Sequence, residues 1–164
     1  MIIIGESINA TRKPIAEALS ERDEETIIQT AVRQAEAGAD LIDVNGGDPN
    51  KGREAQNMEW LVELVHEHTD CPVSVDSADP EAVEVGLTMA EEADRDRPLL
   101  NSVSLESHRR ESLLPLVRDH DCGVIALLMN DDGPPSSADD RVERAEEIVE
   151  LLGGCGKALD EIVI

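Results

Sequence analysis

The sequence predicts an α/β fold in which parallel strands alternate with helices. Five apolar runs each stop at Asn, Asp or Glu, and the segments between them carry apolar residues at helical spacing. The clearest run is Cys71-Pro-Val-Ser-Val-Asp76-Ser77, which Asp79-Pro80 follows as the start signal of a helix. Because parallel strands end at one common face, these polar groups are expected where α/β folds bind ligands.

The expected elements follow one another in the order that such a fold requires. Met1–Ile4 is the first expected strand, and the polar connection after it holds a short helical piece at Ile15–Leu19. Asp23 is expected to cap a helix that Gly38 ends. The later strands are expected at 40–44, 71–76, 99–100, 124–129 and 162–164. The later helices are expected at 57–69, after Asp79-Pro80, at 109–120, and from Ser137 or Asp139 through Leu152.

Two architectures fit five βα repeats followed by one strand. A doubly wound open sheet suits 164 residues, whereas a (β/α)8 TIM-barrel type usually needs about 250, so this chain would hold strands one to six and lack the last two βα units. Asp43 and Asn45 share one side of their strand, and Ser74 and Asp76 share one side of theirs. Polar residues that point inward favour the interior of a barrel near its top.

The composition disfavours several partners. The chain has a formal net charge of −23, from 37 acidic and 14 basic residues, and such a surface repels nucleic acid and anionic membranes. Trp60 is the single aromatic residue, so no platform for stacking bases is expected. No run is long and apolar enough for a membrane span and no signal-peptide pattern is present, so a cytoplasmic protein is expected. An acid-rich, lysine-poor surface suits a salt-rich cytoplasm.

The sequence contains no metal or nucleophile motif. Cys71, Cys122 and Cys155 are widely spaced and are expected to be reduced, mostly buried thiols. His66 and His68 stand two apart on an expected helix, so they point to different faces and are expected to be surface histidines. No glycine-rich phosphate loop, nucleophile elbow or zinc pattern occurs, and neither a metal nor a catalytic residue is assigned.

Asp76 is the strongest candidate for ligand contact, because a carboxylate at a strand end accepts hydrogen bonds from N–H groups of a ligand. Capping of the following helix is the alternative, although Ser77 and Asp79 are nearer to that helix. Asn101 and Asn130 offer both a donor and an acceptor, which suits a heterocycle with amide-like edges. Turn formation explains these two asparagines equally well.

Three further candidates are weaker. Asn45 precedes Gly46, and Asn-Gly is foremost a turn signal. Glu6 and Asn9 are expected just past the first strand, where solvation of a loop is an equal alternative.

Five short motifs stand in a recognisable order: Ile3-Ile-Gly-Glu-Ser-Ile-Asn9, Leu41-Ile-Asp-Val-Asn45, Val73-Ser-Val-Asp-Ser77, Leu99-Leu-Asn-Ser102 and Leu127-Leu-Met-Asn130. Together they resemble the methyltetrahydrofolate:corrinoid methyltransferases, pterin-binding TIM barrels whose relatives are dihydropteroate synthase and the folate module of cobalamin-dependent methionine synthase. The resemblance covers residues 1–164 as one barrel domain. The opening motif is similar to the methyltransferase branch, because the synthase branch would show an Asn-Val-Thr-Pro-Asp-Ser-Phe run there.

The resemblance implies a pterin site in the mouth of the barrel. The residues that it assigns are Asp76 and Asn101 on the pterin ring, Asn130, Asp43 and Asn45 beside it, Glu6 and Asn9 at the rim, and Ser77. In this family the methyl group on N5 of methyltetrahydrofolate passes to the cobalt of a corrinoid, or cobalamin, carried by a separate protein. The cobalt is the nucleophile, which accounts for the lack of one in this chain.

The expected function is therefore methyl transfer from methyltetrahydrofolate, or a related pterin, to a corrinoid protein. The alternatives are dihydropteroate synthase and a non-catalytic pterin-binding or interaction module. The family's Asp-Pro pair and its last two strands would follow Ile164. The isolated chain is accordingly expected to be inactive, and either to form a homo-oligomer through the apolar edges 2–4 and 162–164 or to be poorly stable.

Overall fold

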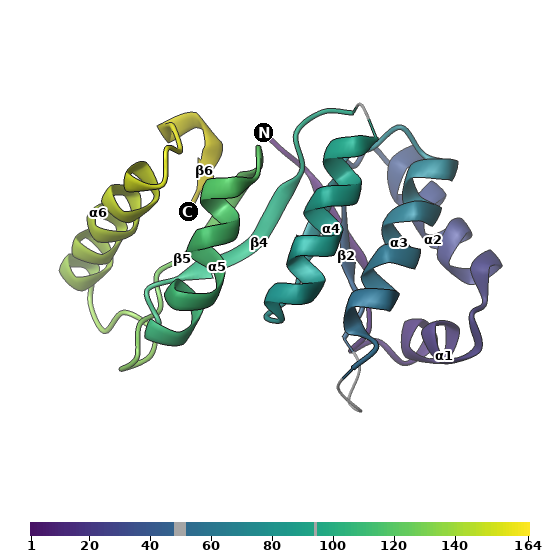
Figure 1. Cartoon of the computed structure of the whole chain (residues 1–164), viewed down its shortest axis with the longest axis horizontal. Helices are drawn as coiled ribbons and strands as arrows, with labels where there is room; N and C mark the ends of the chain where they lie inside the picture. The colour runs from purple at the N-terminus through teal and green to yellow at the C-terminus, as the bar shows by residue number, and fades with distance from the viewer. Residues whose placement is uncertain (48–51, 94) are drawn as a thin grey trace. The chain divides into compact units, whose positions relative to one another are not determined.

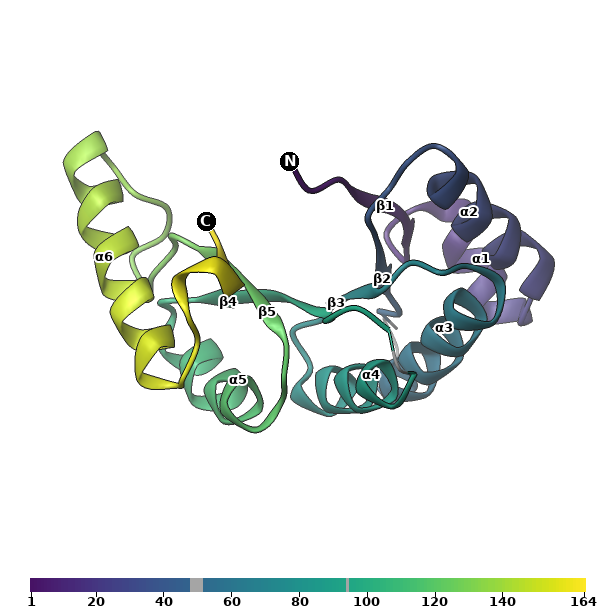
Figure 2. The same ribbon diagram turned by 90° about the horizontal axis from the view of Figure 1, so that it is seen from above.

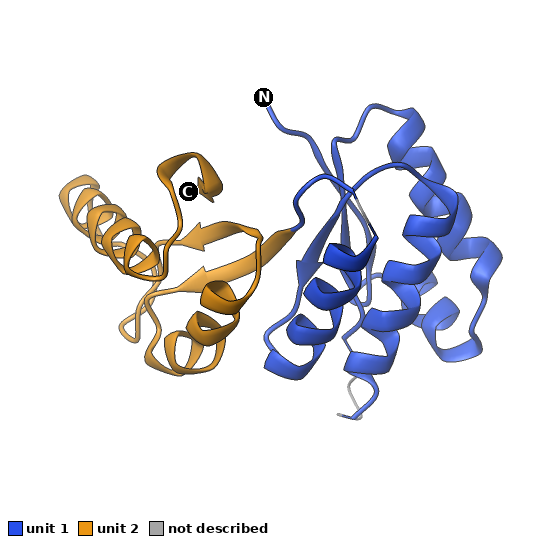
Figure 3. Cartoon of the chain, turned by 45° about the horizontal axis from the view of Figure 1, so that its top comes forward, with its two compact units in different colours: residues 1–98 blue, residues 99–164 orange. Residues whose placement is uncertain are grey.

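The computed structural model describes residues 1–47, 52–93 and 95–164, and in these residues parallel strands alternate with helices (Figure 1). The alternation predicted from the sequence is confirmed. The chain divides into two compact units, Met1–Pro98 and Leu99–Ile164 (Figure 3). Each unit has its own strands and its own helices, and each is described by itself.

The first unit holds three parallel strands in the order β1-β2-β3. Its elements are β1 (Ile4–Asn9), α1 (Lys13–Glu21), α2 (Glu24–Glu36), β2 (Leu41–Asn45), α3 (Glu54–His68), β3 (Val73–Asp76) and α4 (Pro80–Glu92). Helices α2, α3 and α4 pack side by side along one face of these strands (Figure 2). These three helices therefore do not cover the other face of the strands, which carries polar side chains of the strands themselves.

The alternation of side chains along β3 identifies these two faces. A Cβ atom added to Gly86 of α4 would lie 2.8 Å from Val75 Cγ1 and 2.9 Å from Met58 Cγ, so Val75 faces the helices. Its chain neighbours Ser74 and Asp76 face the opposite side. The core under the helices is built from Ile, Leu, Val, Met and Ala side chains, and the chain contains no Phe or Tyr.

The first strand begins later than predicted. Residues 1–3 are exposed and precede β1, although they are wholly apolar. The position of the strand follows from its pairing, because Ile4 is level with Leu41, the first residue of β2. Gly5, which follows, packs against Gln34 of α2, where a Cβ atom would lie 2.8 Å from Gln34 Oε1. Glu6 and Asn9 consequently lie within β1, and the prediction that they follow the first strand is wrong.

The helix starts predicted at Asp23 and at Asp79-Pro80 are confirmed. Asp23 Oδ1 accepts a hydrogen bond from the Thr26 N–H at 3.3 Å, and Asp79 Oδ1 accepts one from the Glu81 N–H at 3.1 Å. Gly38 follows α2 with a φ of +94°, the left-handed conformation that glycine adopts without strain. Two helices are longer than predicted, since α1 extends on both sides of the expected piece and α3 begins at Glu54.

The second unit holds three parallel strands in the order β4-β5-β6. Its elements are β4 (Leu99–Ser104), α5 (Ser107–Asp119), β5 (Gly123–Leu127), α6 (Ala138–Gly154), the 3-10 turn η1 (Leu159–Glu161) and β6 (Ile162–Val163). Ser137 caps α6 through a bond of 3.1 Å from the Asp140 N–H. The prediction that the fourth strand stops at Leu100 is wrong. Asn101 pairs with Ile125 inside the ladder, because a strand residue needs only its backbone to take part.

Candidate functional site

The free face of the first unit carries polar side chains from all three strands. Asp43 is level with Ser74 in the register of β2 and β3, and Asn9 is level with Asn45 in the register of β1 and β2. Residues that are level in neighbouring strands point to the same side of the sheet. The structure therefore brings together, on the face opposite the helices, the predicted residues Asn9, Asp43, Asn45 and Asp76. Glu6 lies on the side of β1 opposite to Gly5 and is exposed.

The deeper part of this face is closed by a buried hydrogen bond. Ser74 Oγ donates to Asp43 Oδ1 at 2.7 Å, with Asp43 2% exposed and Ser74 fully buried. A buried carboxylate is tolerated only where polar groups satisfy it, and the serine does so here. Asp43 thus has a structural partner in the protein itself.

Nearer the strand ends, Asn45 and Asp76 form the second contact across the face. Asn45 Nδ2 donates to Asp76 Oδ2 at 2.9 Å. Both residues are half-buried, so the carboxylate is both oriented by the protein and reachable from outside. This pair is the part of the face best suited to recognise a ligand with N–H groups.

Ser77 has a different environment from the other candidates. It is 3% exposed, its hydroxyl donates to the carboxylate of Glu54, and its oxygen accepts from the Asp79 N–H at 2.9 Å. The hydroxyl therefore joins the first turn of α3 to the cap of α4. Its assignment to the pterin remains a prediction.

Sequence reasoning missed Asn57, which supports the turn after β2. Asn57 is 6% exposed, and its Nδ2 donates to the Gly46 carbonyl oxygen at 2.9 Å. The available signal was a polar residue four positions before Leu61, inside the apolar stripe of an expected helix. A buried amide in such a stripe requires a partner, and the turn provides it.

In the second unit, Asn101 is half-buried within β4. Asn130 follows β5. Its backbone N–H donates to the Gly133 carbonyl at 3.2 Å, and its own carbonyl accepts from the Gly133 N–H at 2.9 Å. Its side-chain Oδ1 accepts from the Asp132 N–H at 3.0 Å. Gly133 has a φ of +100°, which favours glycine. The turn interpretation of Asn130 agrees with this geometry, and pterin contact by Asn101 or Asn130 stays a prediction.

Arg144 of α6 fixes that turn and was also missed. Its Nη1 donates to the Gly133 carbonyl at 2.6 Å and to the Leu128 carbonyl at 3.3 Å, and its Nε lies 2.6 Å from Asp140 Oδ1. The side chain is 8% exposed, which is unusual for arginine unless all its donors are used. The segment that carries Asn130 is therefore tied to α6.

His66 differs from the expected surface histidine. It is half-buried on α3, and desolvation, followed by the charge of Arg95, lowers its pKa to about 4. Among the described residues, no group of three or more His, Cys, Asp or Glu side chains is placed to hold a metal ion. Within the same residues, no helix is long and apolar enough to cross a membrane.

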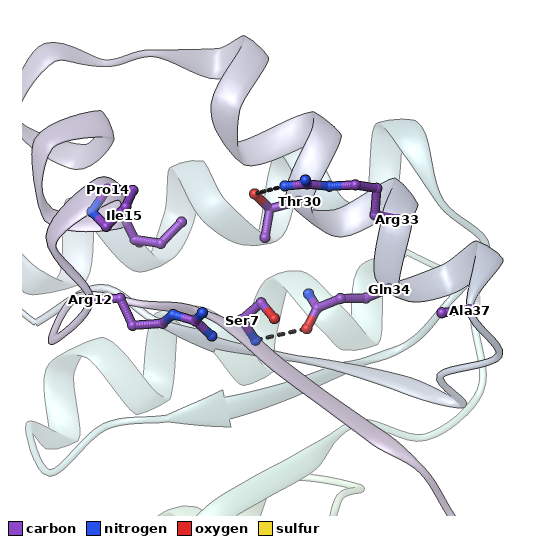
Figure 4. Close-up of a pocket in the computed structure, with 8 residues that line it drawn as sticks. All are labelled: Ser7, Arg12, Pro14, Ile15, Thr30, Arg33, Gln34 and Ala37. Atoms are coloured by element: carbon purple, nitrogen blue, oxygen red, sulfur yellow. Dashed lines mark hydrogen bonds between the residues drawn. The ribbon is translucent and has the colours of Figure 1, made fainter.

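A cavity of about 390 Å³ lies on the helix side of β1, between α1 and α2 (Figure 4). Arg12 and Arg33 border it, and Gln34 accepts a bond of 2.7 Å from the Ser7 N–H at its wall. Because Gly5 also packs on Gln34, this cavity and the polar face lie on opposite sides of β1. The cavity does not contain any of the predicted pterin residues.

Comparison with known proteins gives one family and several relatives. The family model described as pterin binding enzyme matches residues 5–163. The chain is 34% identical over 152 residues to the methylcorrinoid:tetrahydrofolate methyltransferase of Eubacterium limosum, covering 92% of this chain and 54% of that protein. It is 27% identical over 171 aligned residues to the methionine synthase of Mycobacterium tuberculosis, covering all of this chain and 14% of that protein. The chain thus spans about half of the first relative and a small part of the second.

Solved structures agree on the fold. A dihydropteroate synthase from Xanthomonas albilineans in complex with 7,8-dihydropteroate gives a TM-score of 0.62 at 22% identity, covering 98% of this chain and 56% of that one. The 7,8-dihydropteroate synthase of Vibrio fischeri ES114 gives a TM-score of 0.69 at 15% identity, covering 98% of this chain and 60% of that one. At these identities the likeness concerns the fold alone. The predicted α/β fold of TIM-barrel type is confirmed, with six strands that correspond to part of such a barrel.

Proposed function

The chain belongs to the pterin binding enzyme family, and on this premise we propose that it acts in methyl transfer between tetrahydrofolate and a corrinoid protein. The relative at 34% identity supports this proposal, since its name joins tetrahydrofolate and a methylcorrinoid in one reaction. That name places the methyl group on the corrinoid at the start, whereas the sequence motifs suggested methyltetrahydrofolate as donor. A catalyst accelerates both directions, so the direction depends on the supply of the two substrates.

The observation that carries the proposal is the Asn45–Asp76 pair at the end of the polar face. Asp76 Oδ2 is held by Asn45 at 2.9 Å, and no contact among the described residues occupies Asp76 Oδ1. A pterin presents an amide-like N–H beside an amino group on one edge of its ring. A carboxylate accepts both hydrogen bonds, and such charge-assisted bonds are stronger than neutral ones.

In this proposal the polypeptide binds and orients the pterin. A corrinoid carried by a separate protein would supply the methyl acceptor or donor: its cobalt would be the nucleophile when methyltetrahydrofolate is the donor, and the leaving group when the methyl group passes to tetrahydrofolate. Asp76 would fix the ring, and Asn101, Asn130 and the rim residues Glu6 and Asn9 would add contacts that the resemblance assigns. Each of these assignments is tested by its own alanine variant. We also propose that the chain, residues 1–164, acts as one pterin-binding domain.

The direct test is calorimetry of the 164-residue chain with methyltetrahydrofolate. Asp76→Ala and Asp76→Asn should weaken binding about ten- to a hundredfold, because a lost charge-assisted bond costs about 1.5–3 kcal/mol. Asp119→Asn, at an exposed carboxylate that ends α5, is the matched control and should bind as the wild type does. Unchanged affinity in the Asp76 variants would remove this residue from the site.

Activity is tested with methyltetrahydrofolate and a corrinoid protein. The isolated chain is expected to be inactive, so methyl exchange should not exceed the uncatalysed rate, and p-aminobenzoate should not be converted to a pteroate. Conversion of p-aminobenzoate would instead assign the chain to dihydropteroate synthesis. Pterin binding without either reaction would agree with a binding module as the function of the chain alone, whereas methyl exchange above the uncatalysed rate would show that the expected inactivity is wrong.

Self-association is a further part of the proposal. Ile2, Ile3, Val163 and Ile164 are between 40% and 60% exposed, and apolar side chains of this size favour contact with a second copy. Light scattering at low concentration should show a homo-oligomer, and a monomer would contradict this part.

A further inference from the structure

The turn that follows β2 holds the Asn45 side chain at both of its ends. Asn45 Nδ2 donates to Asp76 Oδ2 at 2.9 Å, while Asn45 Oδ1 accepts from the Gly47 N–H at 3.1 Å. The second bond fixes which atom of the side-chain amide is the oxygen, because the NH₂ group is itself a donor and does not accept a hydrogen bond from a backbone N–H. The NH₂ group is therefore directed at the carboxylate by the hydrogen bond that the backbone of the turn donates to the amide oxygen.

The turn itself is packed tightly enough to hold this orientation. Asn57 Nδ2 donates to the Gly46 carbonyl at 2.9 Å, and the Ala10 N–H donates to the Asn45 carbonyl at 3.1 Å. A Cβ atom at Gly46 would lie 2.8 Å from Asn57 Cβ, and one at Gly47 would lie 3.2 Å from Asn45 Oδ1. Two consecutive glycines are thus needed for the close approach of α3 and for the bond to the asparagine.

We propose that Asn45 is a positioning residue that aims the Asp76 carboxylate at the ligand through a hydrogen bond from its side-chain amide. This inference rests on the proposed function, in which Asp76 binds the pterin. A carboxylate on a freely rotating Asp side chain samples several orientations. The bond from Asn45 selects one of them and keeps Oδ2 turned toward β2, so that Oδ1 faces away from Asn45.

The pH dependence of ligand binding by an Asn45→Asp variant distinguishes a positioning role of Asn45 from a merely structural one. Asn45→Asp keeps the size of the side chain but replaces the NH₂ donor by a second carboxylate. Two carboxylates at this distance can form the bond only while they share a proton. The variant should therefore orient Asp76 at low pH and lose that orientation as the pH rises, because the pair then carries two negative charges.

The experiment is calorimetric binding of methyltetrahydrofolate at several pH values from about 4.5 to 8. Relative to the wild type at each pH, Asn45→Asp should bind nearly as well at the acidic end and about tenfold or more weakly at the alkaline end. Asn45→Ala should bind about tenfold more weakly at every pH, since it has no proton to share. Circular dichroism of each variant reports whether the fold is kept.

Gln29→Glu is the matched control. Gln29 Nε2 donates to Glu25 on the exposed surface of α2, so this variant also places a carboxylate beside a carboxylate, away from the polar face. Its binding should follow the wild type at every pH. If Asp76→Ala abolishes binding but Asn45→Asp keeps the wild-type pH profile, Asn45 does not position Asp76 and the inference fails. If Asp76→Ala binds normally, the proposed pterin contact fails instead.

Discussion

The environment of His66 gives the fold a defined dependence on pH. The Arg95 guanidinium donates to the His66 carbonyl at 2.6 Å, and the ring is half-buried on α3. Desolvation and, secondarily, the Arg95 charge lower the pKa of His66 from 6.5 to about 4. Glu63, Glu67 and Glu92 border, together with His66 and Arg95, a cavity of about 330 Å³.

The sign of the effect follows from proton binding. Between pH 6.5 and about 4 the unfolded chain carries a proton on this histidine and the folded chain does not. Acidification through this window therefore favours unfolding, and the contribution of the neutral ring is complete above pH 6.5. A shift of this size corresponds to at most about 3 kcal/mol, and partial exposure of the ring reduces the expected loss to about 1–2 kcal/mol.

The assay is urea denaturation of the wild type and His66→Gln at pH values from about 4 to 7.5. Carboxylates affect both proteins equally, so the difference between the two curves isolates the histidine. As the pH falls over this range, the free energy of unfolding should decrease by about 1–2 kcal/mol more for the wild type than for His66→Gln. His68→Gln, at an exposed ring on the same helix, should keep the wild-type slope. Equal slopes for wild type and His66→Gln, or an NMR titration of His66 near pH 6.5, would refute the argument.

Three further substitutions test packing and capping. Gly86→Ala should destabilise the protein by about 1–3 kcal/mol despite the better helix propensity of alanine, because its Cβ would lie 2.8 Å from Val75 Cγ1; a denaturation midpoint equal to or above that of wild type would contradict this. Arg144→Ala should speed hydrogen exchange in residues 128–133 and cost about 2–3 kcal/mol, whereas Arg141→Ala, one turn away and exposed, should do neither. Asp23→Ala should lower the melting temperature through the lost cap of α2, and an unchanged melting temperature would show that the cap bond contributes little.

Local patterns in the sequence predicted those features that depend on local chemistry. The alternation of Asp43 with Asn45 and of Ser74 with Asp76 places all four side chains on one face, as the register of β2 and β3 shows. Helix caps were likewise predictable, since a cap joins residues that are two or three apart in the chain. The opening of α4 after Asp79 is an example.

The features that could not be predicted depend on contacts between distant residues. The start of β1 is set by its register with Leu41, 37 positions after Ile4, while the apolar residues 1–3 gave a stronger but misleading local signal. His66 is half-buried and its backbone carbonyl accepts from Arg95, which comes from beyond the next helix. Spacing on one helix could not reveal either contact, because each partner is brought near only by the packing of the whole unit.

Burial along the strands indicates which of two similar pairs can serve a ligand. Asp43 with Ser74, and Asn45 with Asp76, are two hydrogen-bonded pairs across β2 and β3 that lie two residues apart, a step of about 6.6 Å, with the carboxylate on β2 in the first pair and on β3 in the second. In the deeper pair the serine donates to an almost fully buried carboxylate, so a ligand would have to displace a closed hydrogen bond to reach it. In the pair at the strand ends the carboxylate is half-buried and keeps an oxygen beyond its bond to asparagine. These contacts support the proposal that Asp76 binds the ligand, while the Asp43–Ser74 hydrogen bond joins β2 and β3 beneath it.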